Sequence, residues 1–153
     1  MLNIPSVGGL SWVYEQIEDR LTSGPLALKL IDSIDPANGS PMHISHRGVA
    51  VTIPTTTNTG LYRDDTFALA SDRVEVSVSY QVRPEEQRAS RREAIVLEEQ
   101  VRVLLTDEAY QRDLHLAYDS TSFRGPHPQT SEFYLITQVF TTKRDAALGG
   151  FDA

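Results

Sequence analysis

Apolar residues recur every fourth position over residues 9–21, the first periodic segment of the chain. Val13, Ile17 and Leu21 form the apolar stripe, and the charged residues of the segment lie off it. This spacing predicts an amphipathic helix that buries one face. We expect Ser11 to cap its start, and the Ser-Gly-Pro sequence that follows to end it.

A strict alternation of apolar and polar residues covers residues 73–82 and predicts the clearest strand of the chain. One face would be apolar, and the other would carry the polar side chains that begin with Arg73 and Glu75. Residues 84–105 then predict a second helix, with Pro84 in its first turn. Its apolar stripe begins at Ala94, so the first half of this helix is nearly all polar.

The remaining strands are shorter or less regular. Residues 26–34 and 42–53 predict a hairpin, because an Asn-Gly pair lies between them. Residues 114–123 predict a further strand. Residues 132–142 predict a last one, which is apolar on both faces and is therefore expected inside the sheet. The pattern indicates a single α+β domain over residues 1–142, with a mixed, mainly antiparallel sheet of about four or five strands covered by two helices.

Two segments show no clear period. Residues 54–72 are rich in threonine and predict a long loop, whose apolar residues Leu61, Tyr62 and Phe67 would dock on the domain itself or on a neighbouring subunit. Residues 143–153 predict a flexible C-terminal tail.

Composition narrows the possible functions. The chain has 153 residues, a net charge of −7 and no cysteine. Disulfides, thiolate catalysis and Cys-ligated zinc are therefore excluded. Such an acidic chain is a poor candidate for a general nucleic-acid binder. The first residues lack the pattern of a secretory signal, and no stretch is long and apolar enough to span a bilayer, so we expect a cytoplasmic protein.

Candidate chemistry is sparse. The sequence contains neither a phosphate-binding glycine loop nor a nucleophile elbow. His43 and His46 would point to opposite faces of a strand, which disfavours a shared metal ion. Adjacent glutamates such as Glu98 and Glu99 diverge on a helix. We therefore assign no catalytic residue, cofactor or metal ligand, and expect a protein that is not an enzyme.

An arginine cluster in the second predicted helix has two interpretations. Arg88, Arg91 and Arg92 could grip phosphate or an acidic partner surface. They could equally form a solvated helix face with local ion pairs to Glu85 and Glu99.

Two stretches of the sequence resemble a known family. One is RVEVSVSYQV at residues 73–82, which runs into RPEEQRASRREAI at 83–95. The other is FRGPHPQ at 123–129, followed by SEFYLI at 131–136. Both resemble the tail terminator proteins of long-tailed bacteriophages and, more loosely, other small neck proteins at the head–tail junction. The order of elements matches over most of the chain, whereas similarity between residues is confined to these stretches.

The resemblance implies a structural virion protein that is assembled in the host cytoplasm. Such proteins close into a hexameric ring that stops growth of the tail tube and presents a docking surface to the head connector. DNA passes through the lumen without specific binding, and neither membrane nor cofactor is involved. The interface candidates are Arg73, Glu75, Leu61, Tyr62, Phe67, Arg88, Arg91, Arg92, Arg124 and His127.

Two alternatives stay open. A head-closure or connector-adaptor protein would share the size, the acidity and the ring. A dimeric ferredoxin-like domain that binds or converts a small molecule belongs to a different class, and the two predicted helices and the strands would allow it. Flanking portal, capsid and tail-tube genes would favour a virion protein, and flanking metabolic genes would favour the ferredoxin-like domain.

Overall fold

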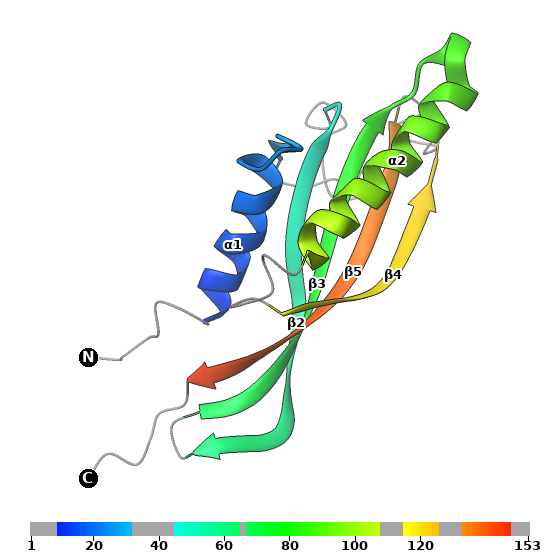
Figure 1. Cartoon of the computed structure of the whole chain (residues 1–153). Coiled ribbons are helices and arrows are strands. Elements are labelled where there is room, and N and C mark those ends of the chain that lie inside the picture. Colours follow the sequence, from blue (N-terminus) through cyan, green and yellow to red (C-terminus); the bar gives the residue numbers. More distant parts are fainter. Residues whose placement is uncertain (1–8, 32–44, 65–66, 108–114, 126–132, 148–153) are drawn as a thin grey trace.

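The computed structural model describes residues 9–31, 45–64, 67–107, 115–125 and 133–147. They form one mixed sheet of five strands in the order β1-β2-β3-β5-β4, with two helices on one face (Figure 1). The predicted single α+β domain is confirmed. The strands are β1 (Lys29–Leu30), β2 (Gly48–Asp64), β3 (Phe67–Gln81), β4 (Leu116–Arg124) and β5 (Phe133–Ala147).

Both helices follow their sequence patterns. Helix α1 (Leu10–Thr22) buries Val13, Ile17 and Leu21, as the four-residue spacing predicts. Gly9 occupies the N-cap position in extended conformation, so the expected cap at Ser11 is wrong by two residues. The chain leaves the helix at Ser23, because glycine and proline follow and cannot continue it well.

Helix α2 (Gln87–Thr106) follows a short 3₁₀ turn, η2 (Pro84–Glu86), that holds the expected proline in its first position. The buried residues of α2 form one stripe that faces the sheet: Ser90, Ala94, Leu97, Val101, Leu104 and Leu105. Its first half is polar and largely exposed, as predicted. This half extends past the end of the sheet in Figure 1.

The predicted long loop at residues 54–72 is wrong, because β2 and β3 form one long antiparallel hairpin through this segment. Threonine-rich sequences suit strands, since β-branched side chains pack well on a pleated surface. The alternation is hidden by register shifts between Thr52 and Thr55 and between Asn58 and Tyr62. A bulge moves the following side chains to the other face, so the period of two is lost.

The predicted C-terminal tail is also wrong over its first part. Strand β5 continues to Ala147, and residues 143–147 pair with residues 67–71 of β3. Residues 148–153 lie outside the described residues. The pairing extends β5 because β3 is itself longer than predicted and offers a free edge for these backbone groups.

The predicted hairpin between residues 26–34 and 42–53 is wrong in direction. Strand β1 has two residues and runs parallel to β2, with Lys29 opposite Gly48 and Leu30 opposite Val49. Parallel neighbours need a longer connection than a tight turn, and the chain between Leu30 and Gly48 is long enough to provide it. The Asn-Gly pair lies outside the described residues.

The three long strands, β2, β3 and β5, run through two regions of the molecule that differ in what covers the sheet. In the first, which we call the body, α1 and α2 cover one face of the sheet, and the apolar core lies between the layers. In the second, which we call the arm, residues 55–64, 67–72 and 143–147 continue the sheet beyond both helices (Figure 1). No helix among the described residues is long and apolar enough to cross a membrane.

Candidate assembly surfaces

The face of the sheet opposite the helices holds a groove of about 410 Å³. The alternation of β3 turns Arg73, Glu75 and Ser77 to this face, while Val74 and Val76 enter the core. Residues from β3, β4 and β5 line the groove: Arg73, Glu75, Ser77, Ser120, Thr121, Ser122, Arg124, Leu135, Thr137 and Val139. We call this surface the open face.

Serine and threonine are the most frequent residues of the open face, beside three charged residues and two apolar ones, Leu135 and Val139. Ser77 Oγ lies 3.2 Å from Thr137 Oγ1 across two strands. Arg73 Nε donates to Glu75 Oε1 at 3.3 Å, and this exposed ion pair contributes little to stability. The structure thus brings together three of the sequence-predicted interface residues, Arg73, Glu75 and Arg124, on one polar surface.

The arginine cluster of α2 lies apart from the open face. Arg88, Arg91 and Arg92 are exposed, and within the described part of the chain none of them has an ion-pair partner. The local pairs with Glu85 and Glu99 that one interpretation expected are therefore absent there.

A polar network that the sequence analysis did not find anchors the start of α2 to the end of β3. The guanidinium of Arg83 binds Glu93 through two nitrogens, at 2.9 and 3.0 Å, and donates from Nε to Glu86 at 2.8 Å. Tyr80 donates its hydroxyl to Glu93 Oε2 at 2.7 Å. Ser90 Oγ accepts from the backbone N–H of Arg83 and so replaces a missing helical partner.

These contacts determine the charge states at this end of the sheet. Hydrogen bonds from Arg83 and Tyr80 lower the pKa of Glu93 to about 2. The imidazole of His46 packs edge-on against Tyr80 and accepts the backbone N–H of Gln81 at Nδ1. Burial, and then the charge of Arg47, lowers the pKa of His46, so the neutral ring is favoured in the fold.

A buried ion pair joins two strands of the arm. Asp72 is fully buried, and both of its oxygens accept from the guanidinium of Arg144, at 2.7 and 3.1 Å. Thr142 and Thr56 donate to the same carboxylate. Burial raises the pKa of Asp72, but these four hydrogen bonds outweigh it, and the net pKa lies below its ordinary value. No local signal could have predicted this pair, because 72 residues separate its members.

The remaining predicted interface residues outside α2 lie in the arm or outside the described residues. Leu61 and Tyr62 belong to β2 and Phe67 begins β3, so all three lie in the arm rather than in a loop. Their side chains lie outside what the structure describes. His127 also lies outside the described residues.

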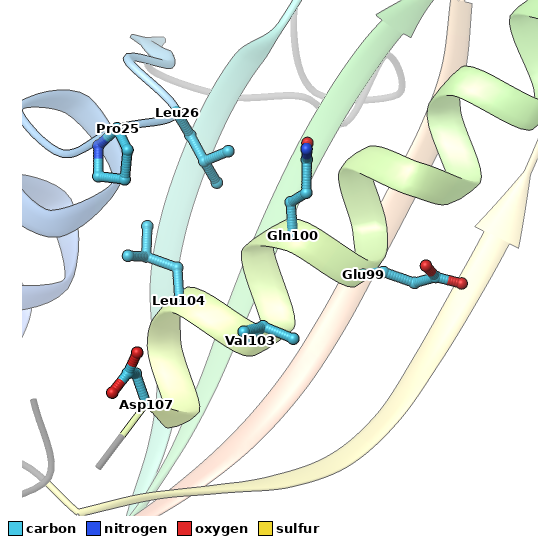
Figure 2. Close-up of a pocket in the computed structure, with 7 residues that line it drawn as sticks. All are labelled: Pro25, Leu26, Glu99, Gln100, Val103, Leu104 and Asp107. Atoms are coloured by element: carbon cyan, nitrogen blue, oxygen red, sulfur yellow. The ribbon is translucent and has the colours of Figure 1, made fainter. Parts of the chain in front are cut away.

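A second groove, of about 430 Å³, lies on the helical side of the molecule. Figure 2 shows that Pro25 and Leu26 approach from the connection after α1, and that Leu104 of α2 points toward Pro25. Val103, which is 63% exposed, lies on the same side of α2. Glu99, Gln100 and Asp107 complete the lining, so the groove is apolar with an acidic rim.

Metal ligands and known relatives were the two remaining indications of function that this site could give. The described residues contain no group of three or more His, Asp or Glu side chains that could hold a metal ion. No protein-family model matches the chain, and no curated protein matches it either.

Proposed function

We propose that this chain is a structural protein of a long-tailed bacteriophage virion, a tail terminator. Copies of the chain close into a ring that caps the tail tube and joins it to the head connector. This proposal rests on the resemblance of residues 73–95 and 123–136 to that family and on the form of the open face. In this proposal the protein acts through its contacts with other proteins rather than by catalysing a reaction.

The open face is the observation that carries the proposal. A channel for DNA needs a surface that neither holds phosphates by many cations nor offers apolar walls to them. The groove-lining residues of the open face are mostly uncharged, with Arg73, Glu75 and Arg124 as the charged ones. This composition supports a wall along which DNA slides.

The arm supports a docking role at one end of the ring. Its strands extend beyond both helices, so their outer surfaces are available to a neighbour (Figure 1). Thr55 and Thr57 are exposed there and offer hydroxyl groups to a partner. We propose that the arm contacts the tail tube protein or the head connector.

The head-closure protein is the alternative of the same class, and the partner of the arm separates the two. A terminator binds the purified tail tube, whereas a head-closure protein binds the portal end of filled heads. Mixing the protein with each particle and counting bound copies by electron microscopy assigns the role.

Deleting the gene tests the proposed function directly. The expected products are tails of uncontrolled length, or filled heads without tails, and the intact gene supplied in trans restores infectious virions. A matched gene that lacks residues 58–68, the tip of the arm, is expected to fail in this rescue. Normal virions after the deletion would overturn the proposed function.

The apolar groove of Figure 2 favours one candidate from a different class, a small-molecule binder. Its volume lies within the range of ligand pockets. A binder of apolar ligands would take up a fluorescent apolar dye in this groove and lose it in a Val103→Glu variant. Dye uptake that is unchanged by this substitution would count against the small-molecule binder.

A further inference from the structure

Two helix surfaces of this protein carry opposite charges at the same spacing. On α2, Arg88, Arg91 and Arg92 occupy positions i, i+3 and i+4; we call them the basic patch. On α1, Glu15, Glu18 and Asp19 occupy the same three positions; we call them the acidic patch. Residues at this spacing lie together on one side of a helix.

The basic patch contains charge repulsion that its own helix does not relieve. Arg88 is three and four positions from the other two arginines, which makes like-charge neighbours on one face. Glu85, three positions before Arg88, is the one carboxylate at these spacings, and no ion pair joins the two. Nearby Glu86 and Glu93 are already bound by Arg83.

The acidic patch shows the same feature with the sign reversed. Glu15 is three and four positions from the other two carboxylates, and none of the three forms an ion pair within the described part of the chain. Asp19 accepts one hydrogen bond, from the hydroxyl of Ser23. Burial, and then the charge of Glu15, raises the pKa of Glu18.

The two patches lie on opposite flanks of the molecule. Helix α1 lies beside β2, and Glu15 and Asp19 are on its side away from the buried stripe. Helix α2 lies over β3 and β5 (Figure 1). Arg91 is two turns before Glu98 on α2, and Glu98 accepts from Thr121 of β4, so this side of α2 faces β4 rather than α1.

We propose that the basic patch of one copy binds the acidic patch of the next copy, so that the chains associate head to tail. Two different patches on opposite flanks are what a heterologous contact requires, and such contacts close into rings when the rotation allows it. Each helix then supplies the charges that relieve the repulsion on the other. The inference deepens the proposed function, because it assigns the contact between ring neighbours.

A second copy fits the basic patch better than nucleic acid does. The protein carries a net charge of −7, which repels a polyanion at long range. Three arginines also neutralise few phosphates compared with the six to ten contacts of an ordinary DNA-binding protein. The acidic patch, in contrast, has the same number of charges at the same spacing as the basic patch, and its charges have the opposite sign.

Charge reversal with rescue tests the contact. Sedimentation velocity of the full chain is expected to show assembly at about 0.01 M salt, where the Debye length is about 30 Å, and dissociation near 1 M, where it is about 3 Å. Arg88→Glu/Arg91→Glu/Arg92→Glu is expected to abolish assembly, and so is Glu15→Lys/Glu18→Lys/Asp19→Lys. The variant that combines all six substitutions is expected to assemble again.

Mixing provides a second, independent readout. The first triple variant has two acidic flanks and the second has two basic flanks, so each alone is expected to remain monomeric. An equimolar mixture is expected to form alternating complexes. The matched control reverses two exposed lysines outside both patches and the open face, Lys29→Glu/Lys143→Glu, which makes the protein more acidic as the first triple variant does and is expected to leave assembly intact.

The outcomes separate this inference from the proposed function. A monomeric wild-type protein at low salt, triple variants that assemble normally, or a control that dissociates equally would each overturn the inference. Binding of DNA that is lost with the basic patch, without any change in assembly, would overturn it in favour of nucleic acid. Normal virions after gene deletion would overturn the proposed function, while salt-dependent assembly would still support the contact between patches.

Discussion

The body and the arm share three continuous strands but are stabilised by different interactions. In the body, fully buried side chains such as Ile17, Leu97 and Phe140 fill the space between the helices and the sheet. Among the arm residues whose side chains the structure describes, the buried apolar ones are small, Ala68 and Ala70, and a buried ion pair lies beside them. Apolar burial therefore dominates in one region and directed hydrogen bonds in the other.

One sheet thus contains two regions that are expected to unfold differently. Apolar packing is non-directional and cooperative, so the body is expected to unfold as one unit. The arm has no helix layer among the described residues, and it depends on the register of its strands. Because Thr56, Asp72 and Thr142 lie opposite one another on three strands, their hydrogen bonds define that register.

The largest effect is expected from a cavity in the body. Phe140 is fully buried, and its ring meets Tyr118 edge-on at 5.9 Å. Phe140→Ala is expected to lower the free energy of unfolding by about 3–5 kcal/mol, through lost burial and the cavity left behind. Urea denaturation measures it. Val103→Ala, at an exposed position of α2, serves as the control and is expected to change stability by less than about 0.5 kcal/mol.

A substitution in the arm is expected to have a somewhat smaller and more local effect. Arg144→Met would leave the carboxylate of Asp72 buried without its cation, and breaking such a pair costs about 3 kcal/mol or more. Amide hydrogen exchange is expected to accelerate at residues 67–72 and 143–147, with little change in α2. Equal acceleration in both regions would show that body and arm unfold together.

The double variant Asp72→Val/Arg144→Met separates charge burial from shape. It removes both charges, so no buried carboxylate is left unpaired, and protection of the arm is expected to recover in large part. If the double variant is as unprotected as Arg144→Met alone, the hydrogen bonds from Thr56 and Thr142 to Asp72 are what hold the arm.

A smaller effect is expected where a hydrogen bond supports the body. Ser90 is fully buried, accepts from the N–H of Arg83 at 3.0 Å and donates to the carbonyl of Glu86 at 2.9 Å. Ser90→Ala is expected to reduce the free energy of unfolding by about 1–2 kcal/mol, because a backbone donor loses its partner. Thermal unfolding measures the loss, with the exposed Ser122→Ala as a near-neutral control.

The body could be predicted from the sequence because its patterns are local. The four-residue spacing in α1 and the strict alternation at residues 73–82 each lie within one element and state which face is buried. Strand β5, apolar on both faces, is paired on both sides as expected. The same alternation identified Arg73 and Glu75 as residues of a polar sheet face, which is where the structure places them.

The arm could not be predicted, because its determinants are not local. Three register shifts between β2 and β3 hide the alternation, and the pairing that makes residues 143–147 a strand comes from residues 67–71 of β3. Asp72 and Arg144 are distant in the sequence, and each is unremarkable in its own segment. The two charged patches are predictable only in part. The spacing of their charges is visible in the sequence, whereas their positions on opposite flanks of the molecule are not.

Each region contains a carboxylate whose pKa is lowered in the fold. Hydrogen bonds from Arg83 lower the pKa of Glu93 in the body from 4.5 to about 2, and the pKa of Asp72 in the arm also lies below its ordinary value of 3.8. The unfolded chain therefore binds protons at higher pH than the folded chain does. The stabilisation is present above pH 4.5 and is lost as the pH falls toward about 2. His46 adds to this loss below pH 6.5, because its neutral form is favoured in the fold.

Each region has its own probe for this titration. Trp12, the one tryptophan of the chain, packs against the core of the body, so its fluorescence reports unfolding there. Glu93→Gln is expected to flatten the decline of body stability between pH 4.5 and 2, by a small amount because Glu93 is exposed and screened by solvent. Asp72→Asn is expected to leave that fluorescence curve nearly unchanged and to flatten the acid response of arm amides in NMR spectra. If Asp72→Asn instead changes the Trp12 curve, the arm contributes to the stability of the body, and the two regions form one cooperative unit.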